Sequence, residues 1–384
     1  MHPKPFSTRD RRRRGGGLPI LATLAAALLA FFCAQPRALA QIPDVFAVSG
    51  IAVDVTGQSA SAARERAMAG AESEAFRRLV ARLVLDEDRS RVPRLQPAEV
   101  SRLIRDFSVA EEKTSAVRYL AKLTYRFRPD SVRSLFADSG IAFAETPSKP
   151  VLVLPVLRQN GIDNLWDANP WLKVWRDLPP SDGLVPLAAP SGDLVDVSAI
   201  GVEQVLRGEG LGDATGRYGA TDAIIVVADV GQDPMTNRSR ISITMTRYGS
   251  APDAQPYQTE FALAPTDDPN VILAKAALAI GAEIQGRWKR SNRIDRGTVA
   301  VTAVTAVTVP LSSLEEWVAV SKRLRDIAVV RQVEVVLLTR AEVRLNLHYL
   351  GDLDQLVIAL EQADLNLSSR EGERILRRVA GRNR

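Results

Sequence analysis

The stretch LWDANPWLKVWRD, Leu165–Asp177, gathers the residue types in this chain that are best suited to bind a ligand or a partner. It holds three of the chain's five tryptophans, with Asp163 just before it and Asp167 inside it. Indole rings beside carboxylates can form a sugar platform or an anchor for another protein, and they can also form part of a core. The candidate partner-binding residues are therefore Trp166, Trp171, Asp163 and Asp167.

The same stretch carries the signals of a short amphipathic helix. Asn169 suits the N-cap, and Pro170 suits the first helical position, where its missing N–H costs nothing. Helical spacing then puts one set of apolar side chains on a single face: Trp171, Val174, Trp175 and Leu178. We expect this face to dock on a buried strand formed by VLVLPVL. An exposed partner groove and a sugar platform stay open, and Trp166 is the ring expected to remain most accessible.

The rest of the chain offers few groups for catalysis. Its one cysteine is Cys33, and its two histidines are His2 and His348. His348 lies on the polar side of the alternating strand VRLNLHYL, where a solvated histidine is expected. The sequence predicts no catalytic residue, no cofactor and no metal site, and zinc sites built from cysteine and histidine are excluded.

The first forty residues predict export. A basic run, Arg11–Arg14, precedes the apolar stretch LPILATLAAALLAFFCA, and Ala38 and Ala40 form an A-x-A site. These are the parts of a secretory signal peptide, so we expect cleavage after Ala40 and a periplasmic location of the Gram-negative type. The protein would then meet the membrane only through this segment before cleavage. An uncleaved anchor is the alternative.

The mature chain is expected to be nearly neutral. Residues 1–40 contain seven of the 50 basic and one of the 45 acidic residues, which leaves 43 basic and 44 acidic residues. Such a balance does not indicate a nucleic-acid partner. The basic tail RILRRVAGRNR is expected to be a solvated end, with a site for an anionic lipid or polymer as the alternative.

The spacing of apolar residues and the clusters of proline predict an α+β protein built from several small, sandwich-like α/β domains. The predicted boundaries are residues 41–146 for an N-terminal α+β domain, 147–292 for a middle α/β domain and 293–384 for a C-terminal domain. In the first, strands FAVSGIAVDVTG and AVRYLAKLTYRFR accompany the helices SASAARERAMAGAESEAFRRLVARLV and AEVSRLIRDF. Arginines on the outer face of the second strand are expected to be solvated, with an anionic partner as the alternative.

The middle segment predicts a buried strand VLVLPVL and three further strands, closed by an amphipathic helix. The glycines of GEGLGDATG follow a helix rather than a strand, which excludes the nucleotide-binding fingerprint and favours a flexible turn. The last segment shows the order βαββαβ, typical of ferredoxin-like domains. Its first helix has a predicted capping box at Ser312 and Glu315, with Trp317 in a core stripe beside Leu314, Val318 and Leu324.

Several blocks in order, DVFAVSGIAVDV, VRYLAKLTYRFRPDSVRSLFADSGI, KPVLVLPVL and LWDANPWLKVW, resemble the proteobacterial family named domain of unknown function 2066. The resemblance covers most of the mature chain and implies an exported protein, without catalytic residues to carry over. The middle segment is also similar to small α/β modules of envelope proteins, which bind other proteins.

Together these features predict a non-catalytic periplasmic protein that serves cell-envelope assembly or maintenance through protein-binding surfaces, with envelope proteins as partners. One alternative is a hydrolase, dependent on carboxylates or a metal, that acts on an envelope polymer. It requires acids that converge in a cleft with raised pKa values. The second alternative is a membrane-tethered scaffold that keeps residues 1–40. The sequence leaves the oligomeric state open.

Overall fold

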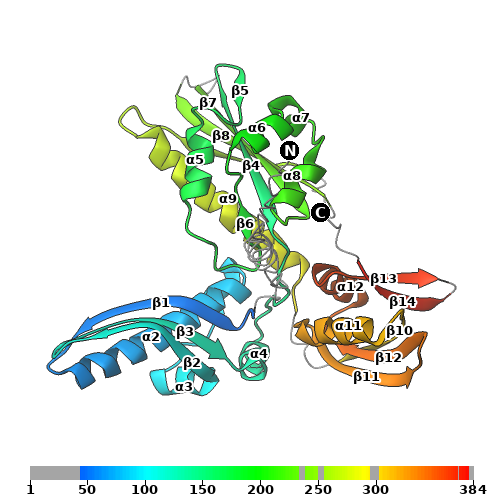
Figure 1. Cartoon of the computed structure of the whole chain (residues 1–384). Coiled ribbons are helices and arrows are strands. Elements are labelled where there is room, and N and C mark those ends of the chain that lie inside the picture. Colours follow the sequence, from blue (N-terminus) through cyan, green and yellow to red (C-terminus); the bar gives the residue numbers. More distant parts are fainter. Residues whose placement is uncertain (1–43, 233–237, 250–254, 295–301, 371, 380–384) are drawn as a thin grey trace, which may run out of the picture. The chain divides into compact units, whose positions relative to one another are not determined.

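A computed structural model describes residues 44–232, 238–249, 255–294, 302–370 and 372–379, which form three β-sheets with helices (Figure 1). The predicted signal peptide, Cys33 and the cleavage site after Ala40 lie outside these residues. The predicted α+β class is confirmed.

The first sheet is antiparallel and has the order β1-β3-β2. Its elements are β1 (Ala47–Thr56), α2 (Ala60–Leu83), the 3-10 helix η1 (Asp86–Arg91), α3 (Pro97–Leu103), β2 (Ile104–Thr114), β3 (Arg118–Phe127) and α4 (Pro129–Asp138). Helix α2 packs on β1 and β3 through the predicted stripe, which is buried throughout: Ala63, Ala67, Ala71, Ala75, Leu79 and Leu83. Alanine at four of these positions lets the helix backbone approach the sheet closely.

One prediction in this segment is wrong. The helix expected over AEVSRLIRDF ends at Leu103, and strand β2 begins at Ile104. Phe107 and Val109 of β2 pair with Tyr125 and Leu123 of β3, so pairing with a neighbouring strand overrides the local helical preference.

The middle sheet has the order β5-β4-β7-β8-β9, with β6 paired to β4. Its strands are β4 (Val151–Gln159), β5 (Ile162–Asn164), β6 (Leu187–Ala188), β7 (Asp222–Gln232), β8 (Ser239–Tyr248) and β9 (Tyr257–Ala262). The helices are α5 (Pro170–Asp177), α6 (Leu194–Ala199), α7 (Val202–Leu206), α8 (Leu211–Arg217) and α9 (Pro269–Ser291).

Both faces of the middle sheet are covered, which explains the continuous apolar run of β4. Val151 and Val153 pack in one cluster with Trp171 of α5 and Ile280 of α9. The alternate residues of β4 pack in another cluster: Leu152, Leu154 and Val156, with Val205 of α7 and Leu211 of α8. Helix α8 forms where a flexible turn was predicted. Gly208 and Gly210 adopt positive φ angles just before it, which a side-chain-bearing residue would adopt only with strain.

The third sheet has the order β11-β12-β10-β14-β13. Its elements are β10 (Ala303–Pro310), α11 (Leu314–Asp326), β11 (Val330–Leu338), β12 (Glu342–Tyr349), α12 (Leu353–Gln362), β13 (Leu365–Arg370) and β14 (Glu373–Arg378). The predicted βαββαβ elements are present, but β14 follows them and lies between β10 and β13. Strand β14 runs parallel to β10. The ferredoxin-like strand order is therefore not confirmed, and part of the basic tail belongs to the sheet.

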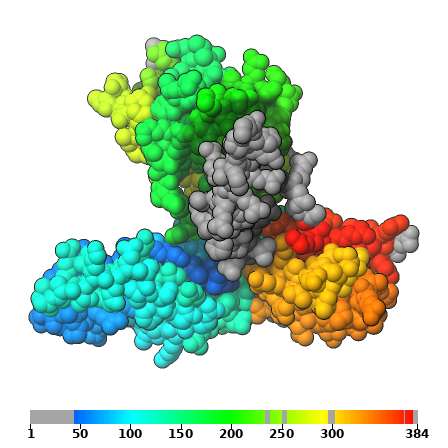
Figure 2. All heavy atoms as spheres, in the orientation of Figure 1, coloured from blue at the N-terminus to red at the C-terminus, as the bar shows by residue number. Residues whose placement is uncertain are grey.

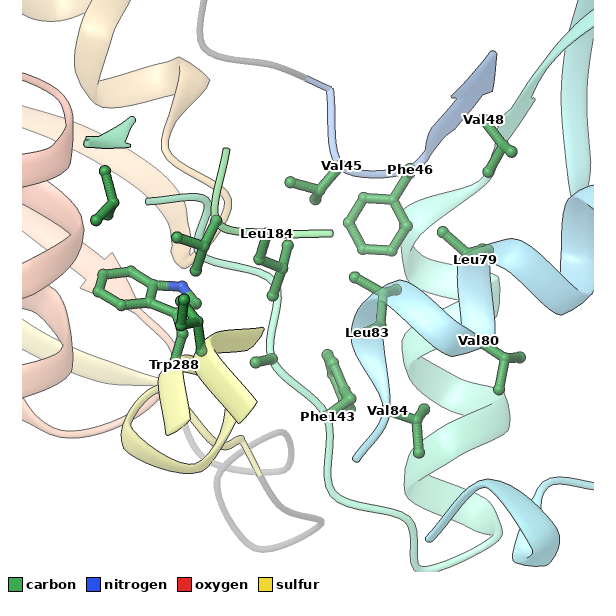
Figure 3. Packing of buried hydrophobic residues seen from close by; sticks show 14 of the residues in the cluster. Val45, Phe46, Val48, Leu79, Val80, Leu83, Val84, Phe143, Leu184 and Trp288 are labelled. Atoms are coloured by element: carbon green, nitrogen blue, oxygen red, sulfur yellow. The ribbon is translucent and has the colours of Figure 1, made fainter. Parts of the chain in front are cut away.

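A continuous apolar cluster includes residues from all three sheets, such as Val48, Val151 and Val307. Figure 3 shows part of this cluster, in which Phe46 faces Leu83. Trp288 belongs to the same cluster. The Trp288 indole N–H donates to the carbonyl of Thr146 at 2.7 Å. The positions of the domain boundaries at 146 and 292 stay a prediction.

A buried ion pair lies close to this cluster. Arg133 of α4 donates from Nε and Nη2 to the two carboxylate oxygens of Glu145, at 2.8 and 3.2 Å. Glu145 is wholly buried and Arg133 is 7% exposed, with its guanidinium 5.2 Å from the ring centre of Phe46. Burial raises the pKa of the Glu145 carboxyl, while Arg133 acts to lower it.

Candidate protein-binding site

The tryptophan helix is part of the core. Helix α5 begins as predicted, because Asn169 accepts a hydrogen bond from the Leu172 N–H at 3.1 Å and Pro170 is the first helical residue. Trp171 is wholly buried, and its indole N–H donates to the carbonyl of Val226 at 3.0 Å. Trp175 is 5% exposed and meets Trp171 edge to face. The predicted docking of this helix on β4 is confirmed, and in this structure Trp171 has no surface to offer a partner.

Trp166 lies in the other cluster of the middle sheet. Its ring is partly buried against the Leu152–Leu154–Val156 cluster, and its indole N–H donates to the carbonyl of Ile200 at 2.9 Å. Trp166 and Trp171 therefore belong to different packed layers and do not form a joint platform.

The two candidate acids are not paired with each other. Asp163 accepts hydrogen bonds from Arg158 at 2.7 and 3.1 Å, so its charge is balanced locally. Asp167 is exposed, and its backbone carbonyl accepts from the Asn164 side chain. A role of Trp166, Asp163 or Asp167 in partner binding stays a prediction.

Other side chains that could take part in catalysis or binding also form local pairs. His348 lies on the polar side of β12, as predicted, with Nε2 3.3 Å from the Glu334 carboxylate. The outward cations of β3 face acids: Arg118 with Asp54, Arg126 with Asp106 and Lys122 with Glu111. Within the residues that the structure describes, no three histidine, cysteine or acidic side chains gather as metal ligands would.

The exposed apolar residues concentrate on α11 and β11. Six of the seventeen large apolar side chains that are exposed among the described residues belong to these two elements. They are Leu314, Val318, Val335, Val336, Leu337 and Leu338, with exposures of 67, 59, 46, 62, 44 and 52%. Exposed apolar side chains that gather on two neighbouring elements make this region a candidate interaction site. We call these six residues the α11–β11 patch.

The patch lies beside a free strand edge. Strand β11 ends the order of its sheet, so within the described residues one side pairs with β12 and the other side pairs with no strand. The edge strand β2 differs, because Asp106, Glu111 and Lys113 place charges along it. Charged side chains are a common protection of edge strands, and β11 has only Arg331 and Glu334 in its first half.

A groove runs between α11 and β11. A cavity of about 330 Å³ lies there, lined by Ser321 and Arg325 of α11 and by Val330, Arg331, Gln332, Val333 and Val335 of β11. Both elements reach the surface on the face drawn in orange in Figure 2. The groove therefore combines valine side chains with two arginines and other polar side chains, beside strand backbone that pairs with no strand among the described residues.

This site lies outside the residues that the sequence singled out for binding. Helical spacing predicted that Leu314 and Val318 belong to a core stripe with Trp317, but the two aliphatic side chains are exposed and Trp317 is only partly buried. Helix α11 instead buries Val320, Ser321 and Leu324. The available signal was the run Val335–Leu338, where four consecutive apolar residues break the alternation of a half-buried strand.

The helix cap is also one residue from its predicted place. Ser313 is the N-cap of α11 and accepts from the Glu316 N–H at 3.2 Å, while the Glu316 carboxylate accepts from the Ser312 N–H at 2.9 Å. The predicted pair was Ser312 and Glu315.

Comparison with known proteins adds little. No family model and no curated protein sequence matches the chain. A lipoprotein from Neisseria meningitidis aligns with 36% of this chain and 96% of its own, at 9% identity and a TM-score of 0.24. A Xanthomonas campestris protein of the family domain of unknown function 330 aligns with 38% of this chain and 84% of its own, at 9% identity and a TM-score of 0.16. Scores this low carry no argument about fold or function. The similarity to family 2066 stays a prediction.

No helix in the part of the chain that the structure describes is both long enough and apolar enough to cross a bilayer.

Proposed function

We propose that this chain is an exported periplasmic protein of the cell envelope that binds other proteins and catalyses no reaction, with the α11–β11 patch as a binding surface. The observation that carries the proposal is the row of exposed apolar side chains on a free strand edge. Covering such a surface with another protein lowers the free energy, because apolar area is removed from water and the backbone groups of the strand form hydrogen bonds. The signal-peptide pattern of residues 1–40 supports the periplasmic location.

Site-directed photocrosslinking in cells tests the binding surface. A photoreactive p-benzoylphenylalanine replaces Val336 in the patch, and in a second strain it replaces Leu278, which is 60% exposed on α9. We expect a discrete crosslinked adduct with an envelope protein from position 336 only. Val335→Glu should abolish that adduct, because a carboxylate is costly to bury against an apolar partner. Equal adducts from both positions, or an adduct that Val335→Glu leaves intact, would contradict the proposal.

Fractionation tests the location separately. The protein isolated from the periplasm should begin at Gln41 when its amino terminus is sequenced. Recovery of an intact first segment in the membrane fraction would instead favour the tethered scaffold.

A further inference from the structure

The groove between α11 and β11 has the features of a site for an extended peptide strand. Resting on the proposed function above, we propose that the partner contributes its carboxyl-terminal segment, which adds to β11 as an antiparallel strand with its terminal carboxylate at Arg325. Three observations support this: the available backbone of β11, the stripe of side chains on α11 that runs from Leu314 to Arg325 and the distribution of charge along the groove.

The backbone of β11 is regular over a short stretch. Register shifts relative to β12 occur between Val330 and Gln332 and between Val335 and Leu337. Between them, Gln332–Val335 keep continuous pairing with β12. A partner strand can therefore form ladder hydrogen bonds with the outer edge over about four residues before the bulges change the direction of the backbone groups.

The helix side of the groove carries a stripe of side chains of matching length. Leu314 and Val318 lie at helical spacing from Ser321 and Arg325, so all four form one stripe along α11, and the last two line the cavity. From 314 to 325 this stripe is about 16 Å long, at roughly 1.5 Å per residue. That length equals about five residues of a β-strand. Alternate side chains of a five-residue strand would point into the groove.

Side-chain directions on β11 agree with this arrangement. Val333 and Val335 are opposite Leu347 and Leu345 of β12, which are buried on the helix-covered side of the sheet. Val335 is nevertheless 46% exposed, because it lies at the rim that α11 leaves uncovered. An added strand would cover this side chain and the exposed Leu338 together.

The charges give the added strand a direction. Arg325, in the last turn of α11, lines the cavity together with Val330, the first residue of β11. It is exposed and has no ion pair among the described residues, whereas Arg331 in the same lining is paired with Asp130 at 2.6 Å. Asp326 is the one acid in that last helical turn, and Arg323 is in the turn as well. Glu315 and Glu316 lie at the opposite end of the helix.

An antiparallel strand ends where β11 begins, so its carboxyl terminus would meet Arg325. The bulge at Val330 and Gln332 ends the regular edge at the same place. A chain terminus fits there better than a strand that continues. A guanidinium–carboxylate pair is a charge-assisted hydrogen bond, and it would favour a free terminal carboxylate over an amide.

Fluorescence anisotropy with the full chain tests the inference. The probe is a library of labelled heptapeptides. Each peptide has valine, leucine or isoleucine at alternate positions and threonine at the positions between them. Each peptide is made in two forms, one with a free carboxyl terminus and one with an amidated carboxyl terminus. We expect members of the free-carboxylate pool to bind, and their amides to bind at least tenfold more weakly. Arg325→Glu should weaken binding of the free acids at least tenfold and reduce the difference between acid and amide. Leu278→Glu is the matched control on α9 and should leave binding unchanged.

Backbone pairing has its own readout. N-methylation at alternate peptide bonds of the best binder should weaken binding at least tenfold, and bound peptide should slow amide hydrogen exchange within Gln332–Val335. A free-carboxylate pool without binders, amides that bind equally well or methylated peptides of unchanged affinity would each overturn the inference.

The outcomes separate this inference from the proposed function. An adduct at position 336 that Val335→Glu removes, together with no peptide binding, would keep the protein-binding function and reject the strand. Two further results would assign the patch to another occupant and overturn the inference: a dimer in sedimentation that Val335→Glu dissociates, or flotation with phosphatidylethanolamine–phosphatidylglycerol vesicles that Val335→Glu abolishes.

Discussion

Removal of Arg133 should destabilise the protein strongly, because it leaves the carboxylate of Glu145 buried without a partner. Glu145 is wholly buried, and both of its oxygens accept from the Arg133 guanidinium. Breaking a buried pair from one side typically costs about 3–5 kcal/mol. Arg133→Met removes the charge and keeps much of the apolar stem, so we expect the free energy of unfolding to fall by about that amount.

The double variant Arg133→Met/Glu145→Leu supplies the control. When both charges are absent no ion needs to be desolvated, so we expect its stability to lie within about 1–2 kcal/mol of the wild type. Urea-induced unfolding, followed by tryptophan fluorescence, measures all the variants. A single variant that costs less than about 1 kcal/mol, or a double variant whose loss equals the sum of the two single losses, would refute this account of the pair.

The pH dependence follows from the direction of the pKa shift. Burial raises the pKa of the Glu145 carboxyl above its usual 4.5 in the folded state, so the folded state binds this proton more readily than the unfolded state does. The contribution of Glu145 to stability is therefore greatest below pH 4.5 and decreases as the pH rises through the folded pKa. In Arg133→Met this pKa should rise further. The deficit of that variant relative to wild type should then shrink on acidification, as measured by urea midpoints between pH 7 and pH 5.

Three further predictions concern the middle sheet and the buried lysine of α9. Trp171→Ala should lower the free energy of unfolding by about 3–5 kcal/mol, and Trp166→Ala by less, because Trp171 is wholly buried and Trp166 only partly; equal losses in urea unfolding would contradict this. Asp196→Ala should cost about 3 kcal/mol or more, because its buried carboxylate accepts from Gly192 N, Ser191 Oγ, Arg217 Nη1 and Tyr218 Oη; a change in unfolding free energy below 1 kcal/mol would show that the network is dispensable. Burial lowers the pKa of Lys289 below 10.5 in the folded state. Between that folded pKa and pH 10.5 the unfolded state therefore binds more protons than the folded state. The contribution of Lys289 to the free energy of unfolding should rise with pH in this window. Lys289→Met should remove that rise, and a wild-type profile in the variant would count against the assignment.

The sequence by itself determined the elements whose periodicity is strong. Three local patterns each specify one kind of secondary structure: the alanine stripe of α2, the continuous apolar run of β4 and the Asn169–Pro170 start of α5. A four-residue spacing specifies a buried helical face, an uninterrupted apolar strand needs cover on both sides, and Asn followed by Pro satisfies the first turn of a helix.

Only the tertiary structure decided which apolar residues stay uncovered. Val335 and Leu338 look like core residues in the sequence, yet they are exposed because β11 lies at the edge of its sheet and α11 covers that edge incompletely. The order of strands decides this, and strand order depends on long-range pairing that local pattern does not encode. Strand β14 shows the same effect: its insertion beside β10 turned an expected ferredoxin-like sheet into a different one, and made a sheet strand of a segment that looked like a solvated tail.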